Sequence, residues 1–283
     1  MKIFVAGAAG LVGSHLARRL AREHEVLALT HGDLDITNRE AVQRCISQAK
    51  PALIVNCAVL QVDDSEKDLA RAQAVNVDGP GYLAEAAQEV GAEIVHFSTQ
   101  YAFDGEPVGR LPYTIEDEPR PVNNYGRTKV AGETAVRAAC ARSFIVRTSW
   151  VYGGGKNSFL CTVANDLKAG GRVRAIDDIW SSTTYVADLI ERVMTIRGTG
   201  QYGTYHVVND GVCTYYQFAF EAGRLLGLTR DRIDSLIAIT HERDMKREAA
   251  RPRYTPLRCV LSEQLGVPPM RDWRAALADF IND

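Results

Sequence analysis

The sequence predicts an α/β fold built on a doubly wound parallel sheet. Two observations carry this prediction: short β-branched apolar runs alternate with helical patterns, and the runs are apolar almost throughout. A strand that is apolar on both sides is buried on both faces, as in a parallel sheet that is covered by helices on each side. The expected strands are residues 2–7, 25–30, 52–58, 93–99 and 143–149.

Helical patterns separate these strands, and the alternation weakens after about residue 152. The expected helices of the first part are residues 14–23, 39–50, 69–90 and 129–141. The second part holds an expected strand and several expected helices: residues 203–210 for the strand, and 159–170, 185–196, 214–227 and the end of the chain for the helices. We therefore expect a domain over residues 1–152 and a smaller lobe over 153–283, interleaved with the last sheet elements.

Composition excludes several classes of partner. The chain has 283 residues, 46% of them hydrophobic, with 33 Lys+Arg against 35 Asp+Glu and a net charge of −2. A basic excess is absent, so we expect neither a nucleic acid nor a membrane surface as a partner. The six cysteines form no C-x-x-C pair and the histidines form no H-E-x-x-H pattern, which indicates free thiols in a cytoplasmic protein and no metal site. No apolar run is long enough to span a bilayer.

The first expected strand leads into a glycine turn, "GAAGLVG", that opens the first helix. Gly7, Gly10 and Gly13 allow a tight turn and a close approach of the backbone to a pyrophosphate at the helix N-terminus. This context predicts a Rossmann-like dinucleotide site. The second strand ends at Thr30 and His31 with no acid at its tip, which favours NADPH, or both NADPH and NADH, although Asp33 and Asp35 follow.

A phenol and an ammonium group are four residues apart in "YGRTK". Tyr125 and Lys129 therefore share one face of a helix. A nearby ammonium favours the phenolate and is expected to lower the pKa of Tyr125, which makes the pair a candidate proton donor. The fourth strand ends at Ser98 and Thr99, and either hydroxyl could bind a substrate carbonyl there.

These motifs, in this order, resemble the extended short-chain dehydrogenase/reductase superfamily and, within it, the dTDP-4-dehydrorhamnose reductase family. The matching stretches include "GAAGLVGSHL", "VHFSTQYAFDG", "NNYGRTKVAGE" and "FIVRTSWVYG", and further matches run to the last helix. The resemblance covers nearly the whole chain. It implies a Rossmann-like doubly wound parallel sheet with a smaller C-terminal substrate-binding lobe.

The resemblance also implies the reaction and the roles of the residues. NADPH or NADH would reduce the C4 ketone of a deoxysugar nucleotide, with dTDP-4-dehydrorhamnose as the first candidate substrate. Tyr125 would supply the proton, Lys129 would adjust the pKa of Tyr125, and Thr99 would polarise the ketone. The implied cofactor-binding residues are Gly7, Gly10, Leu11, Val12, Gly13, Asp35, Ile36, Cys57, Ala58, Val59, Tyr125 and Lys129. The implied substrate-binding residues are Thr99, Gln100, Trp150 and Arg251.

Two departures from the family pattern leave the substrate open. Gln100 stands where the family has an aspartate, and the loop 178–184 lacks the family's Gln, Gly and Pro. Trp150 fits core packing as well as a sugar contact. A regulatory subunit of methionine adenosyltransferase that binds NADP, and a nucleotide-sugar epimerase, are the alternative functions. A homodimer is left open. The acidic stretch 63–68 indicates a solvated helix start rather than a metal site.

Overall fold

A six-stranded parallel sheet lies at the centre of the larger part of the molecule. Its strand order is β10-β5-β4-β3-β1-β2. The computed structural model describes residues 1–283. The sheet strands are β1 (Lys2–Ala6), β2 (Glu25–Leu29), β3 (Leu53–Asn56), β4 (Glu93–Thr99), β5 (Ser143–Thr148) and β10 (Gly203–His206). All six coincide with expected strands, and β3, β4 and β5 are buried at every position. This confirms the predicted doubly wound parallel sheet.

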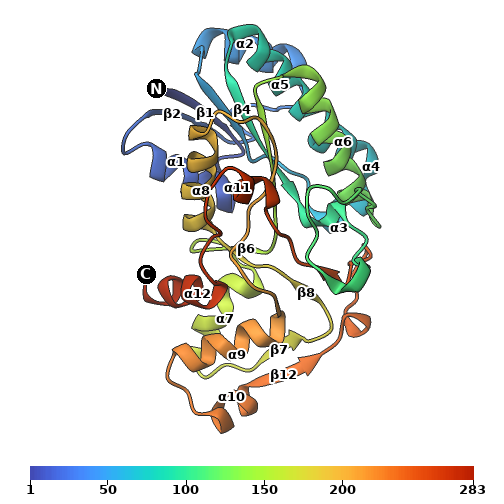
Figure 1. Cartoon of the computed structure of the whole chain (residues 1–283), viewed down its shortest axis with the longest axis vertical. Helices are drawn as coiled ribbons and strands as arrows, with labels where there is room; N and C mark the ends of the chain where they lie inside the picture. Colours follow the sequence, from blue (N-terminus) through green and yellow to red (C-terminus); the bar gives the residue numbers. More distant parts are fainter.

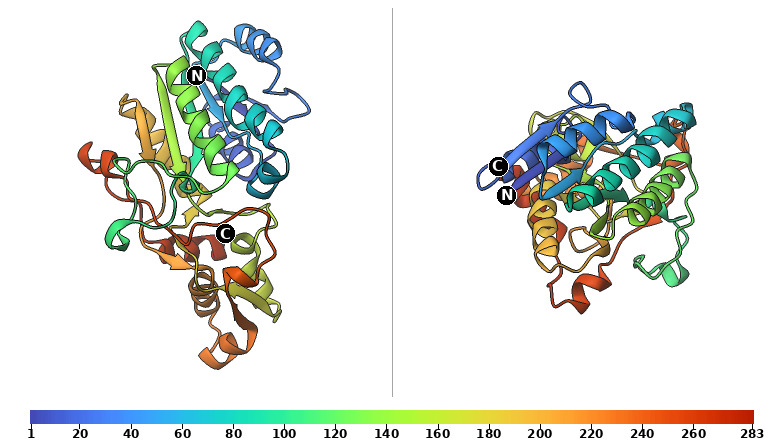
Figure 2. Two further views of the ribbon diagram at one scale, coloured as in Figure 1. Left: turned by 90° about the vertical axis from the view of Figure 1, so that its right-hand side faces the viewer. Right: turned by 90° about the horizontal axis from the view of Figure 1, so that it is seen from above.

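Helices cover both faces of this sheet, as Figures 1 and 2 show. One face carries α2 (Arg39–Ala49), α5 (Gly79–Val90) and α6 (Asn124–Ala139), which lie side by side. The other face carries α1 (Leu11–Leu20) and α8 (Val186–Gly198). A hydrophobic core lies on each side of the sheet, and alternate residues of β1 point into one core or the other. Phe4 belongs to the core on the α2–α5–α6 side, and Ile3 and Val5 belong to the core on the α1–α8 side.

The expected single helix over 69–90 is broken into three parts. It begins as α4 (Leu69–Gln73), continues as a π-helix η1 (Ala74–Asp78) and ends as α5. The wider turn places the buried side chain of Asn76 between two elements: its Oδ1 accepts from Leu60 N at 2.9 Å, and its Nδ2 donates to Thr128 Oγ1 at 3.2 Å. A Cβ atom at Gly132 would lie 2.1 Å from Asn76 O, so glycine allows α6 to pack directly on this turn.

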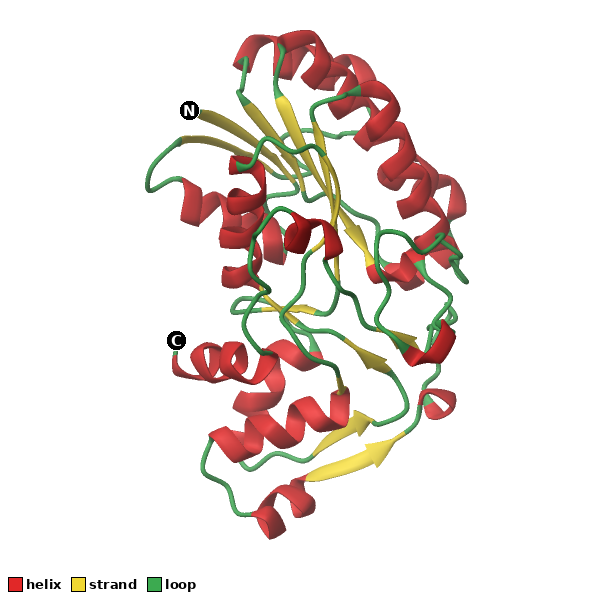
Figure 3. Cartoon of the chain, viewed as in Figure 1, coloured by secondary structure: helices red, strands yellow, loops and turns green.

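The smaller lobe lies below the carboxyl ends of the large sheet, as Figure 3 shows. Its small sheets pair β7 (Val173–Ile176) with β12 (Ile237–Thr240), β8 (Trp180–Ser181) with β11 (Cys213–Thr214) and β13 (Tyr254–Thr255), and β6 (Val151–Tyr152) with β9 (Thr184–Tyr185). Its helices are α7 (Phe159–Lys168), α9 (Tyr215–Leu225), α10 (Arg230–Leu236) and α12 (Trp273–Asn282). The chain returns to the large sheet through α8, β10 and α11 (Val260–Gln264).

A buried ion pair joins α6 to the strand beside it. Arg147 on β5 donates from Nε and Nη2 to the two carboxylate oxygens of Glu133, at 2.8 and 2.7 Å. Ser98 Oγ on β4 donates to the same carboxylate at 2.5 Å. These three bonds fix α6 over β4 and β5, and they hold the pKa of Glu133 below its usual value despite its burial. None of the helices is both long and apolar enough to cross a membrane.

Candidate active site

The glycine turn after β1 brings three backbone segments into close contact. Gly7 has φ +78°, and a Cβ atom there would lie 2.5 Å from Ala58 N. A Cβ atom at Gly13 would lie 2.3 Å from Gly7 O, so the first turn of α1 packs directly on the loop. Gly10 is the N-cap of α1, and neither a capping side chain nor an acidic residue occupies the first turn. The N–H groups at this helix start are therefore free to receive an anion.

A cavity of about 530 Å³ opens at this turn. It lies where the strand order reverses between β1 and β3, the place at which doubly wound sheets bind nucleotides. Seven of the implied cofactor residues line it: Gly7, Gly10, Asp35, Ile36, Cys57, Ala58 and Val59. Of the others, Leu11 and Val12 pack partly buried against the core of the α1 face, and Gly13 is buried beneath the turn.

The far end of this cavity carries both acidic and basic groups. Asp35 accepts from Thr37 N at 2.9 Å and from Thr37 Oγ1 at 2.8 Å, and these bonds lower its pKa. His31 and Arg71 line the same cavity. Sequence reasoning weighed His31 and missed Arg71, because nothing in the helical pattern of 69–90 places α4 beside the tip of β2. Asp33 does not line the cavity, and its carboxylate binds Thr30 instead.

Thr99 ends β4, and Tyr125 lies in the first turn of α6. The N-cap Asn123 accepts from Gly126 N at 2.8 Å, and a Cβ atom at Gly126 would lie 2.2 Å from Tyr101 O. The start of α6 is therefore pressed onto the 3₁₀ turn η2 (Gln100–Ala102) that follows β4. As a result the rings of Tyr125 and Tyr101 meet edge to face with centroids 5.7 Å apart.

The pKa of Tyr125 differs from the expectation. Burial raises it to about 12, and a hydrogen bond with the Thr99 side chain only partly opposes this shift. The expected lowering by Lys129 is wrong for this structure, because the lysine turns away: its Nζ lies 2.7 Å from Phe97 O and 3.4 Å from His96 Nε2. Tyr125 is therefore protonated at neutral pH, which is the state that a proton donor needs.

The two hydroxyls at the end of β4 have different surroundings. Ser98 is turned into the sheet–helix interface, where it donates to Glu133. Thr99 lies on the opposite side of the strand and donates to Gln100 Oε1 at 3.1 Å. Thr99 is also the hydroxyl that interacts with Tyr125. The geometry therefore favours Thr99 over Ser98 as the partner of a substrate carbonyl.

Arg251 reaches the same region from the C-terminal part of the chain. Its Nη2 donates to Asp63 Oδ2 at 2.8 Å, and its guanidinium lies over the ring of Tyr101 at 5.7 Å. Its Nε and Nη1 atoms are buried and have no partner. Asp63 is thus used to hold this arginine, and Glu66 from the same acidic stretch accepts from Asn124 N at 2.7 Å. The stretch therefore contacts both the start of α6 and Arg251.

Trp150 joins the two parts of the chain. It has φ +39°, and its ring stacks on Tyr215 of α9 with centroids 3.9 Å apart. Beside Tyr215 a cavity of about 280 Å³ is lined by Phe159, Arg174 and Arg247. Trp150 packs against the core but is only partly buried. Core packing and a sugar contact therefore both remain compatible with its position. Sequence reasoning missed Arg174 and Arg247, which no motif marks.

Comparison with known proteins places the chain in a family. The model of the RmlD substrate binding domain matches residues 1–283. The chain belongs to the RmlD substrate binding domain family.

Relatives in this family are similar over almost their whole length. The dTDP-4-dehydrorhamnose reductase of Mycolicibacterium smegmatis is 40% identical over 99% of this chain and 85% of the relative. A probable dTDP-4,6-dihydroxy-2-methyloxan-3-one 4-ketoreductase of Streptomyces antibioticus is 36% identical over 100% of this chain and 95% of the relative. The crystal structure of dTDP-4-dehydrorhamnose reductase from Bacillus anthracis in complex with NADP superposes with a TM-score of 0.92, at 32% identity, over 99% of this chain and 98% of that one.

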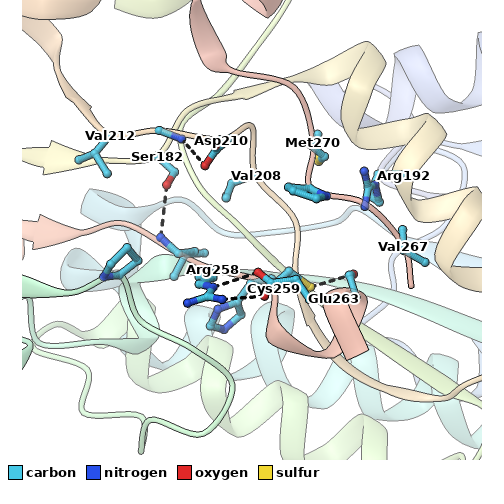
Figure 4. A pocket seen from close by; sticks show the side chains of 16 residues that line it. Ser182, Arg192, Val208, Asp210, Val212, Arg258, Cys259, Glu263, Val267 and Met270 are labelled. Carbon is cyan, nitrogen blue, oxygen red and sulfur yellow. Dashed lines mark hydrogen bonds and ion pairs between the residues drawn. The ribbon is translucent and has the colours of Figure 1, made fainter. Parts of the chain in front are cut away.

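This RmlD-family chain has a further small cavity, of about 160 Å³, on the side of β10 and α11 (Figure 4). None of the expected site residues lines it. Two of its arginines already have partners: Arg258 donates to both oxygens of Glu263 at 2.9 and 2.7 Å, and Arg192 donates to the backbone oxygen of Pro268 at 2.6 Å. The candidate site therefore consists of the cavity at the glycine turn and the residues around Tyr125.

Proposed function

We propose that the chain is an NADPH-dependent reductase of the C4 ketone of a dTDP-linked deoxysugar, with dTDP-4-dehydrorhamnose as its substrate and dTDP-rhamnose as its product. The observation that carries this proposal is a protonated Tyr125 beside Thr99, at the strand ends next to the cavity of about 530 Å³ at the glycine turn. Relatives of 31–40% identity that bear the name dTDP-4-dehydrorhamnose reductase support the choice of reaction.

The residues at the glycine turn fit a nicotinamide dinucleotide. The two glycines that no other residue could replace, Gly7 and Gly13, bring the backbone to the start of α1, where a pyrophosphate would lie. His31 and Arg71 suit a 2′-phosphate, since arginine binds phosphate through paired N–H donors. The NADP complex of the Bacillus anthracis relative supports the same choice. When bound, NADPH supplies the reducing equivalent for the ketone carbon.

The chain's own residues manage the proton and the carbonyl oxygen. Tyr125 gives its proton to the oxygen as the ketone becomes an alcohol, and its raised pKa keeps that proton in place until then. Thr99 directs its hydroxyl at the same oxygen and stabilises the negative charge that develops there. Lys129, buried one turn further along the same helix, brings a charge near the phenol without a hydrogen bond to it.

The substrate's nucleotide half would lie between the two parts of the chain. The free Nε and Nη1 atoms of Arg251 are donors for the diphosphate. The Trp150–Tyr215 stack and the adjoining cavity with Arg174 and Arg247 provide apolar walls and positive charge for the sugar and the nucleotide. We propose that residues 1–152 bind the cofactor, that residues 153–283 bind the substrate, and that the enzyme works in the cytoplasm, with its six cysteines as free thiols.

One specific observation supports a second candidate substrate, another deoxysugar ketone. Gln100 is buried, and its Oε1 accepts from Thr99. The amide thus stands directly beside the group that would polarise the ketone, where a carboxylate would hold the hydroxyl more strongly. A change here alters the sugar that fits without changing the reaction. The Streptomyces antibioticus relative is named for another dTDP-linked ketone, which supports this second substrate.

A substrate panel tests the proposal. The purified protein is given NADPH together with dTDP-4-dehydrorhamnose, dTDP-4-keto-6-deoxyglucose and the corresponding UDP sugar, and kcat/KM is measured from cofactor absorbance. We expect dTDP-4-dehydrorhamnose to give the highest value. A higher value for another 4-keto sugar would move the assignment to that sugar, and the absence of turnover with all three would refute the reductase.

A further inference from the structure

A continuous chain of buried polar contacts leads from the backbone after β3 to Lys129. Ala58 N donates to Asn56 Oδ1 at 3.0 Å. Asn56 Nδ2 lies 3.1 Å from His96 Nδ1, and His96 Nε2 lies 3.4 Å from Lys129 Nζ. Asn56, His96 and Lys129 are each at most 2% exposed, so water does not compete for these contacts. No role in the proposed reaction has been given to Asn56 or His96.

The backbone N–H group of Ala58 determines which atoms donate and which accept along this series of contacts. A backbone N–H can only donate, so the side-chain oxygen of Asn56 must face Ala58 and its NH₂ group must face His96. The Nδ1 atom of His96 therefore accepts. Burial, together with the charges of Lys129 and Arg137, lowers the pKa of His96 well below its usual value and keeps the ring neutral. A neutral ring whose Nδ1 accepts carries its hydrogen on Nε2, the atom that faces Lys129.

We propose that Asn56 and His96 are positioning residues that present an N–H group to Lys129 and thereby favour its neutral amine form. In that form the donors and acceptors along these contacts match: His96 Nε2–H donates to the amine, and the amine donates to Phe97 O. In the ammonium form the lysine has only donors, and an N–H group faces it. Accepting the ammonium would require His96 to change tautomer, which would break its bond with Asn56 or leave the Ala58 N–H unpaired.

The other titratable groups around Lys129 do not remove this effect. Glu133, one turn further along α6, favours the ammonium, but its carboxylate is already bound by Arg147 and Ser98. Cys57, from the loop after β3, is a neutral thiol because burial raises its pKa to about 12. Tyr125 is protonated on the same helix. Burial lowers the pKa of Lys129 to about 8, in the direction that the chain requires.

The consequence for catalysis rests on the proposed function. Because burial lowers the pKa of Lys129 to about 8, its charge changes close to physiological pH, one helical turn from Tyr125. The rate of ketone reduction should then fall as the pH rises through the pKa of Lys129. The state of His96, by contrast, can be measured whether or not the protein is a reductase.

The decisive experiment is ¹⁵N NMR of the histidine rings in the purified full chain between pH 7 and pH 9. We expect His96 to carry its hydrogen on Nε2. His206 is a matched control in the same sample: it is also buried, but its Nδ1 faces Tyr113 O at 3.1 Å and must carry the hydrogen. His96→Gln and His206→Gln assign the two signals. A hydrogen on Nδ1 of His96 would overturn the proposal, whatever the activity of the protein.

A second variant reverses the direction of the hydrogen bonds between residue 56, His96 and Lys129. In Asn56→Asp both side-chain oxygens accept, so His96 should move its hydrogen to Nδ1 and offer Nε2 to the ammonium of Lys129. We expect the pKa of Lys129, followed by NMR of labelled lysine and assigned with Lys129→Gln, to rise by about one pH unit or more. The alkaline limb of the rate profile should move by the same amount. A raised pKa with an unchanged His96 tautomer would show a simple charge effect and contradict the proposal.

Discussion

The Nζ atom of Lys129 lies 2.7 Å from the carbonyl oxygen of Phe97 and makes no hydrogen bond with Tyr125. The two side chains share a helix face, yet the lysine is drawn toward β4 while the phenol stays beside Thr99. Burial is then the largest influence on the pKa of the phenol and raises it to about 12. A phenol that stays protonated is suited to reduction, in which the ketone oxygen needs a proton.

Replacing Tyr125 with phenylalanine should remove the proton donor and leave the fold intact. We expect kcat for ketone reduction to fall by about a hundredfold or more, since a positioned acid contributes at least that much. The dissociation constant of NADPH, measured by fluorescence, should change little. Tyr101→Phe is the matched control, because it removes a hydroxyl from the ring that packs against Tyr125. If the Tyr125 variant kept its full rate, another group would be the acid.

Replacing Gly10 with alanine should separate cofactor binding from folding. A Cβ atom there would lie 3.4 Å from Gly7 O, an ordinary contact, while Gly10 is exposed and lines the cavity. We expect the free energy of unfolding to change by less than about 1 kcal/mol and NADPH to bind about tenfold more weakly or worse. Gly13→Ala, with its 2.3 Å clash, should instead unfold the protein. Unchanged NADPH affinity in Gly10→Ala would exclude the turn as the pyrophosphate site.

Removing Arg71 should change the choice between the two nicotinamide cofactors. Its guanidinium lines the cavity at the end that Asp35 also lines, where a 2′-phosphate would lie. For Arg71→Ala we expect the NADPH dissociation constant to rise about tenfold, the value of one charged hydrogen bond, while that of NADH stays the same. Isothermal titration with both cofactors measures this. Equal weakening of NADH and NADPH would place the arginine elsewhere on the cofactor.

Acid should destabilise the protein through its buried histidines. Burial lowers the pKa of His206 to about 4, whereas an unfolded histidine titrates near 6.5. Between these values the unfolded chain binds the proton and the folded chain does not, so the free energy of unfolding falls as the pH falls, by about 1.4 kcal/mol per pH unit for one such group. His96 acts in the same direction.

Urea unfolding at several pH values between 6.5 and 4 measures this slope. His206→Gln should reduce the slope by about one proton, since glutamine does not titrate. A slope that His206→Gln leaves unchanged would mean that His206 is already protonated in the folded protein.

The sequence alone was sufficient to predict the large sheet, because its strands are continuous apolar runs whose burial leaves little choice of structure. The glycine turn was equally informative, since Gly7 and Gly13 are required by contacts of 2.5 Å or less that any side chain would make. Local spacing also brought Tyr125 and Lys129 onto one face of α6.

Other features depend on tertiary contacts that spacing does not encode. Arg71 lies on α4, and only the tertiary fold brings it to the cavity that His31 and Asp35 also line. The pKa of Tyr125 reflects burial under the turn after β4, and the lysine's orientation depends on a backbone carbonyl of another strand. The pairing of Arg251 with Asp63 joins residues far apart in the chain, so only the fold could show that its other donors remain free.

Cofactor stoichiometry with dTDP-4-dehydrorhamnose tests the central claim most directly. NADPH loss is followed by absorbance, NADPH binding by fluorescence, and the sugar product by mass spectrometry in the same samples. We predict one NADPH consumed for each sugar molecule that gains two hydrogen atoms. Binding of NADPH without any consumption would indicate a regulatory binding protein, and conversion of a sugar without net consumption would indicate an epimerase; either result would contradict the account.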